Sequence, residues 1–406
     1  MYRQFPEPAL ACGTAERVAA RQAGQREAEY HSPSMKSIPE NEPVAAALLG
    51  LIDRYEKESG FWGAFLIEAQ GRVLLSGARG YAHLGFGIPN RPETRFDTAS
   101  VTKIFTAAAA FRLIDRGLVG LEERVRDIID LGDSPIPHEV TLAHCLTHSS
   151  GIADDADEEA GEDYEDIWRE RPCYMVRETR DFLPQFAAKR PLFPPGTACR
   201  YNNCAFVLAG LVLEDRTGMS YRDIVEREVF APAGMTRSGF FAKDGTEPDV
   251  AEGYAEMQDA KVAEVADALR DDPARSPRLR KNIYAYPPVG SPDGGAYTTV
   301  GDLRSFFAAL EGPDYLSPPS RGRILSPVLH YRDLKDGGER RMGYALEHDF
   351  DPSGSRVRFG KDGVNPGVAA IAMRYPDNDG FIALLANRDA DVWTLCRELA
   401  RTAGLV

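Results

Sequence analysis

The chain has 406 residues, of which 43% are hydrophobic, and its formal net charge is −14. This length suits about two or three structural domains. The negative charge argues against a nucleic-acid-binding protein and against adhesion to anionic membranes. No stretch approaches the roughly 20 apolar residues of a membrane-spanning helix, so we expect neither a nucleic-acid partner nor a membrane partner.

The first part of the chain differs in composition from the rest. Residues 1–34 are polar, rich in Arg, Glu and Gln, and lack sustained periodicity, so we expect a disordered extension. They also lack the apolar segment of a secretory signal. Six cysteines are scattered without C-x-x-C pairs, which is typical of reduced thiols. These features predict a cytoplasmic protein, and Met35 is an alternative start that the sequence leaves open.

The next segments alternate in character. Apolar residues recur at helical spacing between 43 and 55, which predicts a helix. The stretch "FWGAFLIEAQGRVLLSGARGYA" predicts two strands with a tight turn at its Gln-Gly pair. A helix follows and ends near Gly117. The acidic run "ADDADEEAGEDYED" further on predicts a solvated loop, with a lid that favours cationic substrates as the alternative.

The end of the chain returns to strands. "GVAAIAMRYP" and "GFIALLANRD" predict a strand pair, and "DVWTLCRELARTAG" predicts a closing helix. Strands at both ends with helices between them predict an α+β fold. We expect an antiparallel sheet flanked by helices and built from both chain ends, residues 35–117 and 285–406. Residues 118–284 would form an inserted, mainly helical domain.

One short stretch, "FDTASVTKIFTAAAA", carries a chemical signal. Ser100 and Lys103 are three residues apart, so on a helix they share one face. A serine hydroxyl needs a base to become nucleophilic, and a partly desolvated lysine can be that base. The N–H of Ser100, near a helix start, can stabilise an anion. The pattern alone is short, and taken alone it favours a helix cap beside a surface lysine.

Two further stretches strengthen the catalytic interpretation. "PPGTACRYNN" places Tyr201 and Asn203 before a helix. A phenol can share a proton with a lysine, and an asparagine can hold that lysine or a substrate amide. "VRFGKDGVNPGVAA" places Lys361 and Gly363 ahead of a strand, where the glycine allows a substrate to approach the backbone closely.

These three motifs occur in the order found in serine β-lactamases and penicillin-binding DD-peptidases. They are Ser100-x-x-Lys103, Tyr201-x-Asn203 and Lys361-x-Gly363. The tyrosine in the second motif resembles the class C β-lactamase branch, with its family VIII carboxylesterases and D-aminopeptidase relatives. Stretches such as "TLAHCLTHSSGI" and "GGAYTTVGDLRSFFAAL" extend the resemblance over residues 40–406.

The resemblance implies a catalytic role for each motif residue. Ser100 would be acylated. Lys103 and Tyr201 would together act as the base and then as the proton donor to the leaving group. Asn203 would orient this pair, and Lys361 would tune Tyr201 electrostatically. The resemblance requires no metal and no organic cofactor, and the sequence contains no H-E-x-x-H motif.

The resemblance also implies how substrate is held. The N–H groups of Ser100 and Val364 would form an oxyanion hole, and Asp362 and Gly363 would border the substrate. β-Lactamases and DD-peptidases usually carry Thr or Ser where Asp362 stands. We therefore expect its carboxylate to repel carboxylate-bearing substrates. The alternative is that the pleat of a strand turns Asp362 away from the site, towards a basic residue.

Other candidate groups have weaker support. His148 suggests a Ser-His-Asp triad, but the sequence has no G-x-S-x-G elbow, so a structural role is favoured. Cys145, Cys199 and Cys204 lie near the motifs without a clear base in sequence, and we interpret them as packing residues.

The sequence thus predicts a serine hydrolase that cleaves a small-molecule ester or amide through an acyl-enzyme on Ser100. A carboxylesterase is favoured. A D-amino-acid peptidase or amidase, a weak β-lactamase, an acyltransferase and a catalytically inactive scaffold remain as alternatives. A homodimer is compatible with the sequence.

Overall fold

The computed structural model describes residues 43–162, 164–169, 171–256 and 279–406, all of which belong to one compact unit. The expected extension, residues 1–34, lies outside the described residues, as does the alternative start at Met35.

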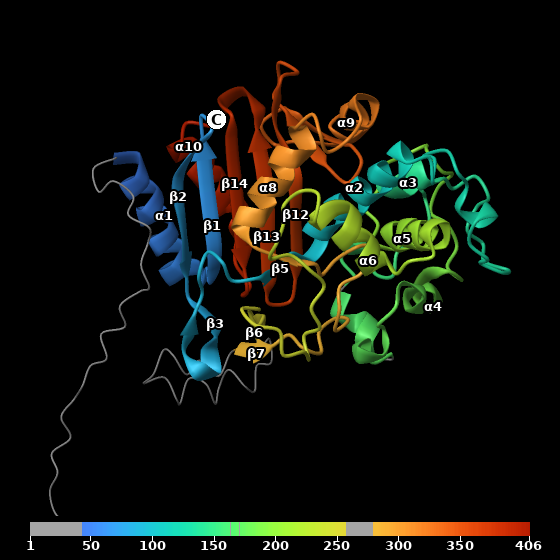
Figure 1. Cartoon of the computed structure of the whole chain (residues 1–406), viewed down its shortest axis with the longest axis horizontal. Helices are drawn as coiled ribbons and strands as arrows, with labels where there is room; N and C mark the ends of the chain where they lie inside the picture. The colour runs from blue at the N-terminus through green and yellow to red at the C-terminus, as the bar shows by residue number, and fades with distance from the viewer. Residues whose placement is uncertain (1–42, 163, 170, 257–278) are drawn as a thin grey trace, which may run out of the picture. The chain divides into compact units, whose positions relative to one another are not determined.

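The centre of the fold is an eight-stranded antiparallel sheet with the order β2-β1-β14-β13-β12-β11-β10-β9 (Figure 1). Its strands are β1 (Gly63–Ala69), β2 (Arg72–Arg79), β9 (Leu329–Asp333), β10 (Glu339–Met342), β11 (Glu347–Phe350), β12 (Arg356–Asn365), β13 (Val368–Tyr375) and β14 (Gly380–Ala386). The N-terminal strand β1 pairs with the C-terminal strand β14 along its length. The prediction of one antiparallel sheet built from both chain ends is therefore confirmed.

The turns between sequential strands follow from their sequence. Gln70 and Gly71, between β1 and β2, have φ values of 52° and 68°, and two positive φ values in succession are typical of a tight hairpin turn. Asp379, before β14, has a φ of 43°, which Asp tolerates better than most residues. Both predicted strand pairs are confirmed.

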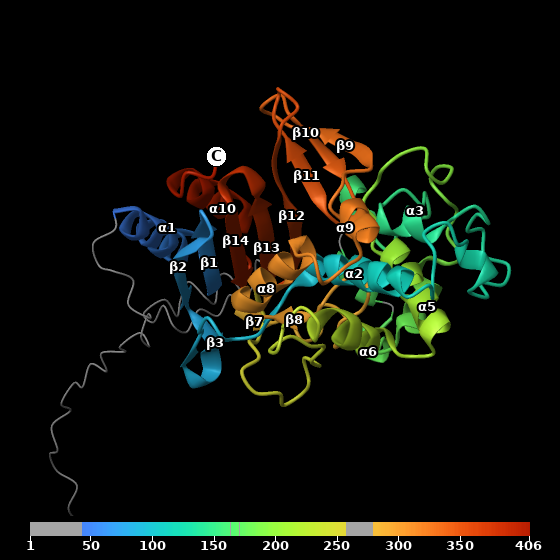
Figure 2. The same ribbon diagram turned by 45° about the horizontal axis from the view of Figure 1, so that its top comes forward.

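Helices cover both faces of the sheet (Figures 1 and 2). On one face, α1 (Pro43–Ser59) and α10 (Val392–Thr402) share an apolar cluster with alternate residues of β13, such as Ile371. The opposite residues of β13, Ala370 and Ala372, join the larger core that includes α2 (Thr102–Asp115) and α8 (Val300–Glu311). The two cores follow from the period of two in a strand.

The region predicted as an inserted domain contains short helices and turns. The α-helices among its described residues are α3 (Leu142–Leu146), α4 (Leu183–Phe186), α5 (Cys204–Thr217) and α6 (Tyr221–Val225). Strands β6 (Tyr254–Glu256) and β7 (Leu279–Lys281) pair within this region. The expectation of a mainly helical domain, with boundaries at 35–117, 118–284 and 285–406, remains a prediction.

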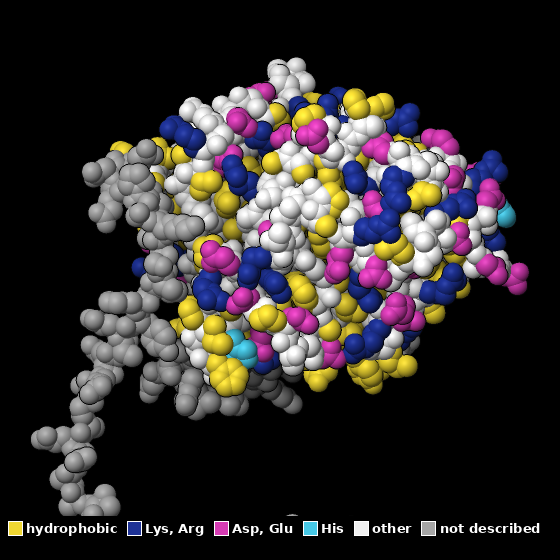
Figure 3. All heavy atoms as spheres, in the orientation of Figure 1, with side chains coloured by type: hydrophobic (Ala, Val, Ile, Leu, Met, Phe, Trp, Pro, Cys, Tyr) yellow, Lys and Arg dark blue, Asp and Glu magenta, His cyan; other side chains and the backbone are white. Residues whose placement is uncertain are grey.

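The remaining short elements complete the fold. They are β3 (Tyr81–His83), β4 (Ile88–Pro89), β5 (Phe96–Asp97), β8 (Tyr297–Thr298) and α9 (Pro318–Ile324). No helix in the described ranges is long and apolar enough to cross a bilayer. On the face drawn in Figure 3, Lys and Arg side chains are interspersed with Asp and Glu, whereas a nucleic-acid-binding face needs basic groups gathered together.

The start of the acidic run does not form a solvated loop. Asp154 and Asp155 are 8% and 7% exposed, so the prediction is wrong for these two residues. Further along the run, Asp157 forms an ion pair with Arg200. The composition of the run could not show that its first two carboxylates are buried beside the start of α5.

Candidate active site

Ser100 lies on a short 3-10 turn, Ala99–Val101, between β5 and α2. Asp97 Oδ1 accepts the backbone N–H of Ala99 at 2.8 Å and so caps this turn. Ala99 has a φ of 44°, a conformation that a residue with a side chain seldom adopts unless its surroundings impose it. The turn is therefore a locally strained support that holds Ser100 at the head of a buried helix.

Two proton-bearing groups converge on the Ser100 hydroxyl. The Tyr201 hydroxyl donates to Ser100 Oγ at 2.6 Å, and Lys103 Nζ donates to the same oxygen at 3.0 Å. Lys103 is fully buried and also donates to Asn203 Oδ1 at 2.8 Å and to the carbonyl oxygen of Asp293 at 2.6 Å. The structure thus brings together the residues of the first two predicted motifs.

His148 supports the segment that carries Tyr201. Their rings stack with centroids 4.6 Å apart, and His148 Nδ1 accepts the N–H of Asn202 at 3.0 Å. Burial lowers the pKa of His148 well below its usual value, and the charges of Lys103 and Lys361 lower it further. A neutral, buried imidazole in this place agrees with the structural role favoured from the sequence.

Lys361, on β12, also lies near the Tyr201 ring. The Nζ atoms of Lys361 and Lys103 are each 5.0 Å from the ring centroid. Lys361 donates to Glu347 Oε1 and, at 3.1 Å, to Asp362 Oδ1. Burial alone would lower the pKa of Lys361, but these two carboxylates outweigh it and raise the pKa. Lys361 therefore remains a fixed positive charge beside Tyr201.

Glu347 is a site residue that the sequence analysis missed. It is 5% exposed on β11, and Arg340 also donates to its carboxylate. Burial raises the pKa of Glu347, but the charges of Lys361 and Arg340 dominate and bring it to about 2. The strand register sets Glu347 opposite Gly360 and therefore next to Lys361. This contact could not be seen in the sequence, because it depends on the register.

Gly363 is where β12 passes the Ser100 turn. A Cβ atom at this position would lie 2.5 Å from Ser100 N and 2.7 Å from Thr98 O, so a side chain here would displace the turn. Ser100 and Val364 line one cleft, open to solvent, with an empty volume of about 430 Å³. The structure thus places both expected oxyanion residues at the same cleft.

Asp362 lies on the other face of the sheet. It pairs with Ile371 in the register of β12 with β13, and Ile371 belongs to the core beneath α1 and α10. Trp393 Nε1, on α10, donates to Asp362 Oδ2. Asp362 is absent from the described residues that line the cleft. The expectation that its carboxylate borders the substrate is not supported, because the pleat turns it away, as in the alternative weighed above.

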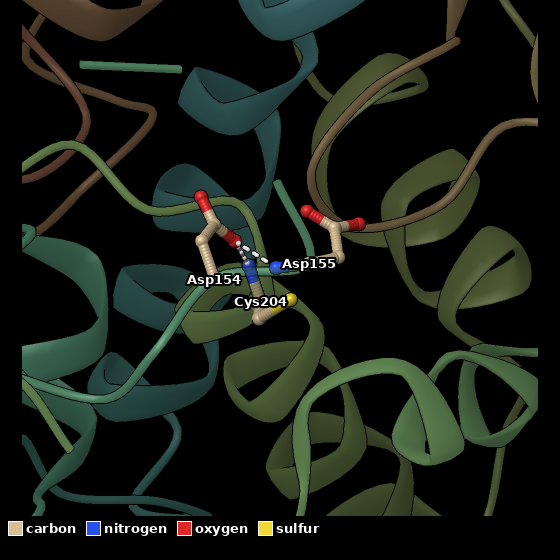
Figure 4. Close-up of side chains that lie close together, drawn as sticks. All are labelled: Asp154, Asp155 and Cys204. Atoms are coloured by element: carbon tan, nitrogen blue, oxygen red, sulfur yellow. Dashed lines mark hydrogen bonds between the residues drawn. The ribbon is translucent and has the colours of Figure 1, made fainter. Parts of the chain in front are cut away.

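Asp154 fixes the start of α5, where Asn203 stands. Its carboxylate accepts the N–H of Asn203 at 2.8 Å. It also accepts the N–H of Cys204 at 2.9 Å (Figure 4). An acidic group at a helix N-terminus satisfies N–H groups that otherwise lack partners. Asp154 thereby helps to place the asparagine that accepts a hydrogen bond from Lys103.

The same corner contains Asp155, and the ligand atoms of Asp154, Asp155 and Cys204 lie within 4.8 Å of one another. That spacing could suit a metal ion, but metal ligands must lose their protons. Burial, together with the Asp154 charge, raises the pKa of Asp155 well above its usual value, and burial raises that of Cys204. These pKa directions apply to the corner without an ion, and the hydrogen bonds of Asp154 to the start of α5 give its carboxylate a structural role there.

The other cysteines near the motifs are also poor nucleophiles. Burial raises the pKa of Cys145 to about 12, and burial with nearby carboxylates does the same for Cys199. A thiol rather than a thiolate is unreactive at neutral pH, which agrees with their interpretation as packing residues. The five cysteines within the described ranges are free.

Comparison with known proteins agrees with this geometry. The β-lactamase family model matches residues 50–404. A penicillin-binding protein of Bacillus subtilis (strain 168) is 26% identical over 343 residues, 84% of this chain and 71% of that protein. Esterase EstB of Burkholderia gladioli is 29% identical over 67% of this chain and 72% of its own length. Some D-aminopeptidases match over about a third of their length.

A solved structure gives the same result for the fold. The crystal structure of a penicillin-binding protein from Bacillus halodurans superposes with a TM-score of 0.77 and 31% sequence identity, and the match covers 87% of this chain and 99% of that one. The family model covers most of the chain, and its relatives include penicillin-binding proteins and an esterase. The chain belongs to the β-lactamase family.

Proposed function

We propose that this protein is a serine hydrolase that cleaves an ester or amide through an acyl-enzyme on Ser100. The observation that carries the proposal is the convergence of Tyr201 OH and Lys103 Nζ on Ser100 Oγ, at 2.6 and 3.0 Å. A hydroxyl within hydrogen-bond reach of two groups that can exchange protons is the arrangement that an activated nucleophile requires.

The proposed reaction begins when Lys103 and Tyr201 take the proton of Ser100 as its oxygen attacks the substrate carbonyl. The N–H groups of Ser100 and Val364 would bind the resulting oxyanion. Tyr201 would return the proton to the leaving group, which leaves the acyl group on Ser100. Water, activated by the same pair, would then release the acid. Lys361 would favour negative charge on the Tyr201 oxygen throughout.

A carboxylic ester is the favoured substrate. Esterase EstB matches over 67% of this chain, which supports an esterase. The relatives with penicillin-binding or D-aminopeptidase names support a peptidase or amidase as the alternative. Both readings use the same nucleophile and differ only in the leaving group.

The test joins labelling and turnover. Incubation with a fluorophosphonate should give one adduct by intact-mass spectrometry, mapped to Ser100, and Ser100→Ala should give none while keeping its melting temperature. Rates with p-nitrophenyl esters, D-amino-acid anilides and nitrocefin would then rank the substrate classes. An adduct on another residue, or no adduct together with no turnover, would refute the proposal and leave the inactive scaffold.

A further inference from the structure

A lysine that this mechanism does not use lies on the wall of the cleft. Lys243 lines the cleft together with Ser100 and Asn203, although its side chain is only 6% exposed. Its Nζ is 3.3 Å from the centroid of the Tyr286 ring and donates to the carbonyl oxygen of Pro287 at 3.2 Å. A buried ammonium at a substrate cleft is costly unless it has partners, so its surroundings are informative.

The counter-ion of Lys243 is Asp97, but the contact is long. Nζ and Asp97 Oδ2 are 3.5 Å apart, whereas a charge-assisted hydrogen bond is about 2.7–2.9 Å. Asp97 has other donors, because its Oδ1 accepts Ala99 N–H at 2.8 Å and its Oδ2 accepts the Tyr286 hydroxyl at 3.0 Å. Among the described residues, those that line the cleft include Lys243 and not Asp97. In the described part of the chain, the ion pair of this cleft-lining lysine is thus a single long contact.

We propose that Lys243 binds a carboxylate on the acyl part of the substrate, so that the site prefers a substrate with an anionic acyl group over one with a free ammonium. The inference rests on the proposed function and names its substrate class. The acyl part of the substrate stays bonded to Ser100 in the acyl-enzyme and therefore stays at this cleft. The leaving group departs when the acyl-enzyme forms. Asp362, on the α10 face, does not oppose such a substrate from within the cleft.

The charges around Lys243 determine the pH range in which we expect the preference for a carboxylate. The groups that face it are the Asp97 carboxylate, the Cys173 thiol and the Tyr286 ring. Burial lowers the pKa of Lys243 to about 8, although Asp97 opposes the change. The other charged side chain of the cleft, Asp293, accepts a hydrogen bond from Ser291 at 2.7 Å. Lys243 is thus charged at pH 7 and loses its charge above about pH 8.

The test compares three p-nitrophenyl esters with acyl chains of similar length: the hemiadipate, the hexanoate and the 6-aminohexanoate. At pH 7, kcat/KM should be highest for the hemiadipate and lowest for the 6-aminohexanoate. In Lys243→Met the ratio of hemiadipate to hexanoate should fall about 10- to 100-fold, the worth of one charge-assisted hydrogen bond. Exposed Lys335 supplies the control, because Lys335→Met should keep the wild-type ratio.

Two further measurements do not depend on the folding of one variant. In the wild-type protein the ratio should decline between pH 7 and pH 9, after subtraction of spontaneous hydrolysis. Adipate should bind to Ser100→Ala in calorimetry, and Lys243→Met in that background should abolish the heat. A ratio unchanged by Lys243→Met and by pH overturns the inference. So does a carboxylate preference found only on the leaving group, tested with 4-carboxyphenyl hexanoate.

The outcomes separate this inference from the proposed function. If the protein shows no turnover of any ester and no labelling of Ser100, the proposed hydrolase activity is refuted. Adipate binding that depends on Lys243 would still support a carboxylate-binding site (the anion site) at this lysine. Normal turnover of the hexanoate without a carboxylate preference would refute the anion site and leave the hydrolase standing.

Discussion

Two buried lysines flank the same tyrosine, and their surroundings differ. Lys103 and Lys361 each lie 5.0 Å from the centre of the Tyr201 ring. Lys103 donates to a hydroxyl, a side-chain amide oxygen and a backbone carbonyl. Lys361 donates instead to the carboxylates of Glu347 and Asp362. The three oxygens that accept from Lys103 here carry no full charge, and the Asp154 carboxylate acts on Lys103 by Coulomb attraction. The two oxygens that accept from Lys361 both belong to carboxylates.

This difference indicates a division of labour. A carboxylate strongly favours the protonated form of a neighbouring lysine, whereas neutral acceptors favour it less. Lys361 is therefore suited to be a constant positive charge, and Lys103, which also contacts the Ser100 hydroxyl, is suited to exchange a proton. The two lysines would act on Tyr201 by different means, one by proton transfer and one by Coulomb attraction.

The sharpest test of this comparison is Lys103→Met, which keeps the volume and removes the amine. We expect kcat/KM for a p-nitrophenyl ester to fall by about 10³- to 10⁴-fold, the upper part of the range for lost acid–base help. Fluorophosphonate labelling of Ser100 should slow in parallel. As a control, Lys57→Met on the surface of α1 should not alter either rate. A fall in kcat/KM of less than tenfold would mean that a group other than Lys103 exchanges the proton.

Tyr201→Phe removes the hydroxyl that both lysines influence. We expect acylation to slow by about 10²- to 10⁴-fold. In the proposed mechanism Lys103 and Tyr201 act as one unit, so the double variant should lose little more activity than the worse of the single variants. Tyr284→Phe, at a position that is 71% exposed, is the matched control. Losses that multiply in the double variant would contradict a shared proton.

Glu347→Gln weakens the fixed charge instead of the proton exchange. Without this carboxylate the pKa of Lys361 should fall, so the alkaline limb of the kcat/KM profile should move to lower pH, with a loss of about tenfold at pH 8. If the alkaline limb of the kcat/KM profile is the same in the variant and the wild type, groups other than Glu347 keep Lys361 protonated.

The same variant has a pH-dependent effect on stability. The pKa of Glu347 is depressed to about 2 by Lys361 and Arg340 despite burial, against about 4.3 for an unfolded glutamate. Its contribution is thus fully present above about pH 5 and is lost as the pH falls towards 2. Breaking a buried pair costs about 3 kcal/mol or more. Urea unfolding should therefore show a large difference in the free energy of unfolding between the wild type and Glu347→Gln at pH 7. This difference should become smaller towards pH 3.

The motifs that the sequence made visible are those with short internal spacing. Ser100 and Lys103 share a helical turn, and Tyr201 precedes the helix that Asn203 opens. Local periodicity predicts such pairs, and both hairpins of the sheet were equally predictable from their turn residues. The order of the motifs then indicated the resemblance to the β-lactamase family, and the resemblance implied the fold.

What the sequence did not reveal depends on register and burial. Glu347 meets Lys361 only because β11 pairs with β12 in one alignment. Lys243 reaches the cleft from a loop without a motif, and Asp154 lies in a run whose composition suggested solvent exposure. Asp362 was assigned to the substrate although a one-residue step along a strand reverses its face. Each of these errors or omissions concerns contacts between segments far apart in the chain.

The smallest expected effect belongs to Asp362→Asn, the weaker of the two carboxylate partners of Lys361. The variant removes one charge and leaves one side-chain oxygen, so only one of Trp393 Nε1 and Lys361 Nζ keeps its present acceptor. Glu347 remains, so Lys361 stays protonated, and kcat/KM should change by less than about threefold. Because Asp362 faces α10, the change should be equal for the hemiadipate and the hexanoate. If Asp362 faced the cleft, two like charges about 4 Å apart would repel by about 4 kcal/mol at an effective dielectric of 20. The hemiadipate alone would then gain strongly from the variant. A selective gain of that kind would mean that Asp362 contacts the substrate. Equal, small effects on the two esters would instead support Lys243 as the charged group that contacts the acyl part of the substrate.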